Sequence, residues 1–388
     1  MKKEDVISLL VYILMIVIAV MVGLYVIRPL FEHFTTGGDS SAVGNMGWAL
    51  LLVLGAIIFN VAIIELGHML GAKLSGYKFF SVNMLGLCFY KKGEKWKVKF
   101  ANFDGLTGET KIAPVKEKAS PRLFSLMPLF FYLIETIALM ITFNVLNNLI
   151  GGDWVPASHR VMLLICILCI IFVTVGGMLT LYNIFPAKLD TTTDGYRLTL
   201  LSKPENAAAF NELMRIECAY AEGKELTDMK VFNEINDFTS SINLYTVYRY
   251  LGEKNYDAAS PILDHIIQEK AKISRETYCS AVAQKMFIVL LNQDLNTAKA
   301  YYDAHIDQAE RRYISNDISM PSIRAYMLIS SMLDISEHEA RFAKSRVKKA
   351  LKRTPPGRVK VEEELYQIAI NKVDQVRPEW HIKDTEVK

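Results

Sequence analysis

Four long apolar runs constrain the fold of this 388-residue sequence more than any other feature. Each is long enough for a helix to cross a lipid bilayer, which takes roughly 20 residues. The 17 Lys and Arg and 13 Asp and Glu of residues 1–199 contrast with 27 and 28 in residues 200–388. The sequence therefore predicts a mainly α-helical membrane protein with four transmembrane helices, followed by an all-α soluble domain. The apolar runs cover residues 6–27, 48–72, 123–150 and 161–186.

Basic residues beside the runs predict the orientation of the chain. Residues 73–122 hold 11 Lys and Arg, whereas residues 29–46 and 151–159 hold none. The basic segment is therefore expected in the cytoplasm, together with both termini. We expect an integral protein of the bacterial plasma membrane. The net charge of +3 is small and lies beside the apolar runs, so composition gives no support to a nucleic-acid partner.

The segment between the second and third runs is not helical in character. Residues 95–100 alternate lysine with Trp96, Val98 and Phe100, which is the period of a half-buried strand. A turn signal at residues 91–94 separates this strand from an apolar stretch at residues 81–90. We therefore expect a small β-hairpin insertion at about residues 78–113, at the inner membrane surface.

Ionisable residues inside an apolar run are costly, so each is a functional candidate. Glu65 and His68 lie three residues apart in the second run and share a helix face, with Gly67 between them leaving room for a second backbone or a ligand. Glu135, in the third run, is expected to be neutral and hydrogen-bonded, with His68 or Asn60 as partner. The alternative for Glu65 and His68 is a polar pair satisfied by neighbouring helices, and the alternative for Glu135 is a ligand in a metal site.

A second polar cluster closes the fourth run. Pro186 removes a backbone donor and ends or kinks the helix, and Asn183 can bond the backbone groups that are freed. Asp194 and Gly195 form a turn signal that places a carboxylate near the membrane face. The alternative is simply a helix end that leaves the membrane.

Together the two clusters resemble the site-2 proteases, which are intramembrane zinc metalloproteases. That family carries H-E-x-x-H on one membrane helix and N-x-x-P followed by D-G on a later one. Residues 65–68 match the last four positions of the first motif, and the second cluster matches the second motif. A strand-rich insertion after the first motif helix is also typical of the family. The resemblance covers roughly residues 47–197.

The resemblance implies that His68 and Asp194 bind zinc and that Glu65 is the catalytic general base. The position of the first histidine is Ile64, which cannot bind a metal. The loss of one of three protein ligands is expected to lower the affinity for zinc by several orders of magnitude.

The spacing of the second motif also departs from the family. Seven residues separate Pro186 from Asp194, more than the family usually has, and Asp190 lies closer to the proline. The identity of the aspartate ligand therefore stays open between the two.

The C-terminal half shows helical periodicity with a faint internal repeat. Ala258, Ala298 and Ala340 lie 40 and 42 residues apart, each early in the second helix of an expected helical hairpin. The pattern resembles tetratricopeptide-type repeats, stretched beyond their usual period of about 34 residues. Such arrays offer a concave surface to a peptide or protein partner, and the alternative is a plain helical bundle. The basic run at residues 344–353 is expected to be a solvated helix face.

Three parts follow from these patterns: an N-terminal helix and external loop (1–46), a site-2 protease-like core (47–199) and a cytosolic helical domain (200–388). We predict a catalytically impaired pseudoprotease that binds a membrane-embedded peptide or protein. One alternative is an active zinc metalloprotease with an altered ligand set, in which Glu135 or Glu65 joins His68 and Asp194. Another is a membrane-anchored helical-repeat adaptor.

Overall fold

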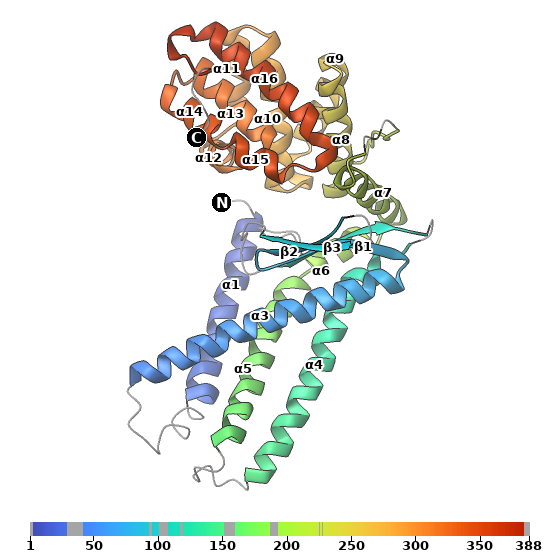
Figure 1. Ribbon diagram of the computed structural model, residues 1–388, viewed down its shortest axis with the longest axis vertical. Helices are drawn as coiled ribbons and strands as arrows, with labels where there is room; N and C mark the ends of the chain where they lie inside the picture. Colours follow the sequence, from blue (N-terminus) through green and yellow to red (C-terminus); the bar gives the residue numbers. More distant parts are fainter. Residues whose placement is uncertain are drawn as a thin grey trace. The chain divides into compact units, whose positions relative to one another are not determined.

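The computed structural model describes residues 3–28, 42–92, 95–100, 108–116, 119–150, 160–186, 193–224, 226 and 228–383. The chain divides into two compact units, Met1–Ala207 and Ala208–Lys388. The first unit contains the apolar helices and a small sheet, and the second contains helices (Figure 1).

The first unit contains four helices that are long and apolar enough to cross a membrane, as predicted from the apolar runs. They are α1 (Lys3–Val22, extended by the π-helical turn η1, Gly23–Ile27), α3 (Ala42–Leu74), α4 (Pro121–Ile150) and α5 (Arg160–Asn183). A short helix, α6 (Asp194–Leu200), follows the connection after α5. In Figure 1, α3 crosses α1, α5 and α4 obliquely.

Two glycines of α3 allow α4 to approach closely. A Cβ atom at Gly67 would lie 2.7 Å from the Cα atom of Pro128, and one at Gly71 would lie 2.9 Å from the carbonyl oxygen of Leu123. Both distances are shorter than non-bonded atoms tolerate. The expectation that Gly67 leaves room for a second backbone is therefore confirmed, and α4 is the element that uses the space.

The insertion after α3 is a four-stranded antiparallel sheet, so the predicted single hairpin was too small. The strands are β1 (Tyr77–Met84), β2 (Leu87–Lys92), β3 (Lys95–Phe100) and β4 (Gly108–Pro114), in the order β3-β2-β1-β4. The additional turn between β1 and β2 places Leu85 and Gly86 at φ of 50° and 84°. Gly86 is a residue type that such turns favour, but a leucine rarely adopts a positive φ, so the signal for this turn was weak.

The two outer strands of the sheet differ in burial and in register. All six residues of β3 are exposed, so the expected half-burial of this strand was wrong. The reason is that neither face of β3 is covered by the described residues, whereas the other edge strand, β4, buries several of its side chains. Strand β4 pairs with β1, and a register shift between Phe79 and Ser81 marks a β-bulge in β1.

The second unit is a series of helices, most of which contribute to a shared hydrophobic core. Side-chain caps begin many of these helices, as at Asn236, Asn255, Asp294 and Ser336. The helices are α7 (Pro204–Ala221, which begins in the first unit), α8 (Asp237–Gly252), α9 (Tyr256–Gln268), α10 (Arg275–Asn292), α11 (Leu295–His305), α12 (Gln308–Asn316), α13 (Met320–Met332), α14 (Glu337–Ser345), α15 (Val347–Arg353) and α16 (Val359–Val376), with short 3₁₀ turns η3 (Lys270–Lys272), η4 (Pro356–Arg358) and η5 (Pro378–Trp380).

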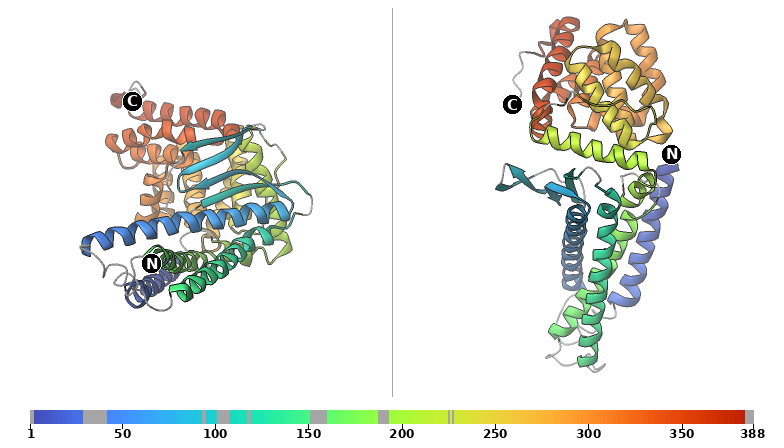
Figure 2. Two further views of the ribbon diagram at one scale, coloured as in Figure 1. Left: turned by 60° about the horizontal axis from the view of Figure 1, so that its bottom comes forward. Right: turned by 90° about the vertical axis from the view of Figure 1, so that its right-hand side faces the viewer.

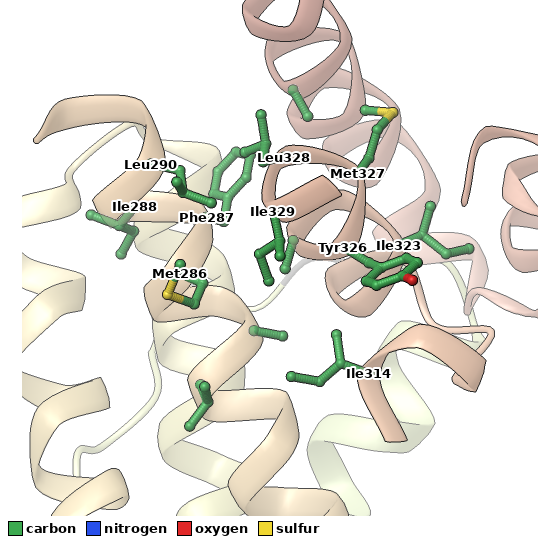
Figure 3. Close-up of a cluster of buried hydrophobic side chains, with 14 of the residues drawn as sticks. Met286, Phe287, Ile288, Leu290, Ile314, Ile323, Tyr326, Met327, Leu328 and Ile329 are labelled. Carbon is green, nitrogen blue, oxygen red and sulfur yellow. The ribbon is translucent and has the colours of Figure 1, made fainter. Parts of the chain in front are cut away.

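The centre of this core lies between α10 and α13. Figure 3 shows Met286, Phe287 and Leu290 of α10 facing the side chains of α13, which include Leu328 and Ile329. Both helices are buried along most of their length, as α8 is, whereas α9, α11, α12, α14 and α16 carry exposed residues. Figure 2 gives two further views of the ribbon, in which the helices of this unit run from yellow-green to red.

The predicted alanines lie near the start of the second helix of each pair, with one correction. Ala298 and Ala340 occupy the fourth positions of α11 and α14, and neither has any exposed surface. In α9 the fourth position is the fully buried Ala259, whereas Ala258 is only partly buried. The N-cap residue sets the phase of each helix, so the predicted alanine was wrong by one position.

The expected solvated face of the basic run was also wrong in part. Lys344 is buried and donates hydrogen bonds from Nζ to the carbonyl oxygens of Ile382 and Lys383. Arg346 is half-buried, and its Nη1 donates to the carbonyl oxygen of Asp317 at 3.3 Å. These two cations hold chain segments in place, and the exposed face consists of Lys348, Lys349, Lys352 and Arg353.

Candidate functional site

The two motif clusters meet inside the first unit at one ion pair. The Nε2 atom of His68, on α3, lies 3.1 Å from Oδ2 of Asp194, the first residue of α6. The side chains are 9% and 4% exposed, so the pair is shielded from solvent. Residues 126 positions apart in the sequence are therefore brought into direct contact, as the motif resemblance predicts for two ligands of one site.

Asp194 also binds the side chains of Asn183 and Arg197. Asn183 donates from Nδ2 to Oδ2 of Asp194 at 2.5 Å and accepts from its backbone N–H at 3.1 Å. Arg197 Nη1 donates to Oδ1 at 2.9 Å. Burial alone would raise the pKa of Asp194, but His68, Arg197 and Asn183 together hold it below its usual value. Both carboxylate oxygens of Asp194 are thus occupied by donors.

The imidazole of His68 is fixed from its other side by α4. Its Nδ1 atom lies 3.1 Å from the carbonyl oxygen of Phe124, which can only accept, so Nδ1 carries a proton. The Phe124 ring lies against the imidazole, with 4.7 Å between the ring centroids. The same ring lies 5.8 Å from the Arg197 guanidinium carbon. His68 therefore has one orientation, with Nε2 directed at Asp194.

Glu65 is held by the sheet. It is 2% exposed, and Thr110 of β4 donates from Oγ1 to its Oε2 at 2.5 Å. A Cβ atom at Gly108 would overlap the Glu65 carboxyl group, so a larger residue there would require the Glu65 side chain to shift. Glu65 and His68 share a helix face as predicted, but each binds a different partner.

The other residues of the second motif lie at the end of α5 and at the start of α6, the short helix that begins with Asp194. A Cβ atom at Gly195 would overlap the backbone carbonyl of Ile184, so this glycine permits close packing of α6 on the end of α5. Thr193 caps α6 by accepting from the N–H of Tyr196 at 3.2 Å. Pro186 lies beyond the last residue of α5, where the helix was expected to end. Asp190, the other candidate ligand, lies outside the described residues.

The donor set does not fit a tight zinc site. His68 and Asp194 supply two donors, Ile64 supplies none, and Glu65 is engaged by Thr110. Catalytic zinc sites use three protein ligands and structural sites four. The guanidinium of Arg197 also lies beside the carboxylate that a dication would need. Within the described ranges, no group of three or more His, Cys, Asp and Glu side chains is arranged to hold a metal ion.

Glu135 lies apart from these contacts. It is buried on α4 at 9% exposure, and neither of its carboxyl oxygens has a hydrogen-bond partner among the residues that the structure describes. The expected pairing with His68 or Asn60 was wrong. Asn60 instead donates to the carbonyl oxygens of Ala56 and Phe172, at 2.9 and 3.1 Å, and so joins α3 to α5.

Three contacts of the site were missed from the sequence: those of Thr110, Phe124 and Arg197. The sequence contained a signal for Arg197, because an aspartate and an arginine three residues apart on a helix are neighbours. Comparisons with family models, curated proteins and solved structures find no match to this chain. The likeness to site-2 proteases therefore rests on the motifs alone.

Proposed function

We propose that this chain is a site-2 protease-like membrane protein with impaired catalysis, which binds a membrane-embedded peptide or protein. The observation that carries the proposal is that the polar side chains of the cluster are bonded to one another and to the sheet. Asp194 is bonded to His68, Asn183 and Arg197, and Glu65 is bonded to Thr110. Side chains that would serve hydrolysis are thus committed to holding the helices and the sheet together.

The sheet supports the binding half of the proposal. Strand β3 pairs with β2 on one side only, so among the described strands its other side offers unpaired backbone groups to an extended peptide. Trp96, Val98 and Phe100 are 48%, 61% and 91% exposed on this strand, and three lysines alternate with them. An apolar, basic strand edge suits the chain that emerges from a membrane-spanning partner.

Metal analysis of the purified protein tests the catalytic half. We expect zinc well below one ion per chain in the wild type. The variant Ile64→His restores the missing donor one turn before His68, and Ile63→His is the matched control on another helix face. Stoichiometric, tightly held zinc in the wild type would overturn the proposal.

Photocrosslinking in native membranes tests the binding half. A photoreactive residue in place of Val98, on the exposed edge strand, is expected to capture a membrane peptide. The control position is Val82 on β1, which is 4% exposed and enclosed by strands on both sides. Equal capture from both positions, or none from Val98, would contradict this half.

One observation favours the alternative of an active metalloprotease. The Nδ1 atom of His68 is bonded to a backbone carbonyl and its Nε2 faces a carboxylate, which is a usual orientation for a metal-binding histidine. On this alternative, Glu65→Gln and His68→Ala each abolish cleavage of a membrane-spanning peptide in vesicles. Unchanged processing by both variants would remove it.

A further inference from the structure

A second group of buried charges lies in the unit Ala208–Lys388, far in sequence from the polar cluster above. It consists of two arginines, Arg324 of α13 and Arg358 at the N-cap of α16, with Glu362 one turn into α16. Aromatic side chains of α8 and α10 surround them. The cluster thus contains two cationic side chains and one anionic side chain.

Arg324 is fully buried and only partly bonded. Its Nη1 donates to Oε2 of Glu362, and its guanidinium carbon lies 5.0 Å from the centre of the Phe287 ring. Its Nε and Nη2 atoms have no hydrogen-bond partner among the described residues. A buried arginine with two unbonded N–H groups on one edge is unusual, because native structures satisfy most such donors.

Arg358 binds the other oxygen of the same carboxylate. Its Nη2 donates to Oε1 of Glu362 at 2.8 Å, and its Nε has no partner among the described residues. The guanidinium carbon lies 4.2 Å from the Tyr248 ring centre and 5.5 Å from that of Tyr245. The side chain is 19% exposed, so it is the member of the cluster that reaches solvent.

The cluster therefore carries one positive charge in excess. A guanidinium stays protonated in proteins, and Glu362 is the one carboxylate that bonds either arginine among the residues described. Aromatic faces attract a cation but do not neutralise it. An uncompensated charge in a protein interior is strongly unfavourable, and an added anion would remove the imbalance.

We propose that Arg324 and Arg358 form a binding site for a compact oxyanion, a carboxylate or a phosphate group, which enters beside Arg358. The three unbonded N–H groups supply donors, and guanidinium groups match carboxylate and phosphate oxygens in pairs. The N-terminus of α16, an 18-residue helix whose N-cap Arg358 makes no side-chain cap, adds a favourable partial charge at the entrance. This site is independent of the function proposed for the membrane unit.

The test is calorimetric titration of the full-length protein in detergent with inorganic phosphate and, separately, with acetate. Ionic strength and pH are held constant, and chloride is the reference anion. We expect one anion to bind per chain. Saturable binding of phosphate, of acetate or of both supports the site. The anion that binds more tightly identifies whether the site takes a phosphate or a carboxylate group.

Three substitutions locate the binding. Arg358→Met leaves one arginine and one carboxylate, so the protein is expected to fold at least as well as the wild type and to lose anion affinity roughly tenfold or more. Glu362→Gln removes the one negative charge, so phosphate is expected to bind more tightly although the unliganded protein melts at a lower temperature. Arg353→Met, exposed on α15, is the matched control and leaves binding unchanged.

Three results would overturn the proposal. The first is a wild-type protein that binds neither phosphate nor acetate beyond the chloride reference. The second is an Arg358→Met variant that binds as well as the wild type. The third is an Arg353→Met control that loses as much affinity as Arg358→Met. Because Arg358→Met balances the buried charges, its folding keeps the test decisive even if Glu362→Gln does not fold.

Discussion

Replacement of Asp194 by alanine is expected to destabilise the membrane unit strongly. The carboxylate accepts hydrogen bonds from His68, Asn183 and Arg197, at 3.1, 2.5 and 2.9 Å. A hydrogen bond to a charged group such as this carboxylate contributes about 1.5–3 kcal/mol, and the substitution removes all three. These losses are not additive, so we expect about 3–5 kcal/mol, the range for breaking one partner of a buried ion pair.

The assay is reversible unfolding in mixed detergent micelles with increasing SDS, followed by tryptophan fluorescence. Glu135→Gln is the matched control, because this buried carboxyl group has no hydrogen-bond partner among the described residues. Its replacement is expected to change the free energy of unfolding by less than about 1 kcal/mol. A double-mutant cycle with His68→Ala isolates the ion pair, and we expect a coupling energy of about 1–3 kcal/mol.

Two results would refute this reasoning. If Asp194→Ala costs no more than the Glu135 control, the carboxylate does not hold α6 against α3. If a strong chelator lowers the unfolding midpoint of the wild type and leaves Asp194→Ala unchanged, a bound metal supplies the stability that we assign to the ion pair.

Three further predictions concern other contacts. Thr110→Val removes the donor to Glu65 and is expected to lower the free energy of unfolding by about 1–3 kcal/mol, with Thr110→Ser close to wild type; equal losses would contradict the bond. Ala298→Leu overfills a fully buried position and is expected to cost about 1–3 kcal/mol, so an unchanged midpoint would argue against close packing of α10 and α11. Hydrogen bonding to Glu310, whose backbone N–H donates to Oδ1 of Asp307 at 3.0 Å, holds the pKa of Asp307 at about 2. The stabilisation is therefore present above about pH 4 and is lost as pH falls towards 2. Solvent screening limits this effect to less than about 1 kcal/mol, and Asp307→Asn should abolish it in acid titration of the unfolding midpoint.

The sequence predicted the long helices of the first unit well, because the signal for them was hydrophobic. The four apolar helices follow directly from the length and composition of the runs. The meeting of His68 and Asp194 agrees with the motif resemblance, although their chemical roles stay predictions. The sequence could not predict that Thr110 binds Glu65, because that contact depends on how a strand of the insertion lies across α3.

The other differences between prediction and structure have local causes, at two places in the sheet and at Lys344. The second turn of the sheet uses Leu85 at a positive φ, a conformation that its residue type does not indicate. The alternating pattern of residues 95–100 indicates a strand but does not show whether another element covers either face. Lys344 was expected to be exposed because lysine side chains usually are. It is buried because its Nζ donates hydrogen bonds to backbone carbonyl oxygens near the C-terminus.

The β-bulge in β1 has a consequence for Glu65. Across the bulge, the partner of Phe79 is Ile112 and the partner of Ser81 is Lys111, so one residue of β1 is passed over without a counterpart. In a strand, a shift by one position turns every side chain to the opposite face. The extra residue lies on β1, so the alternation of β4 is unchanged and Thr110 keeps the face of Ile112. Without it, Ser81 in place of the buried Val82 would lie opposite Thr110, the donor of Glu65. The bulge thus decides that an apolar side chain, rather than a hydroxyl group, packs beside the hydrogen bond of a carboxyl group within an apolar helix.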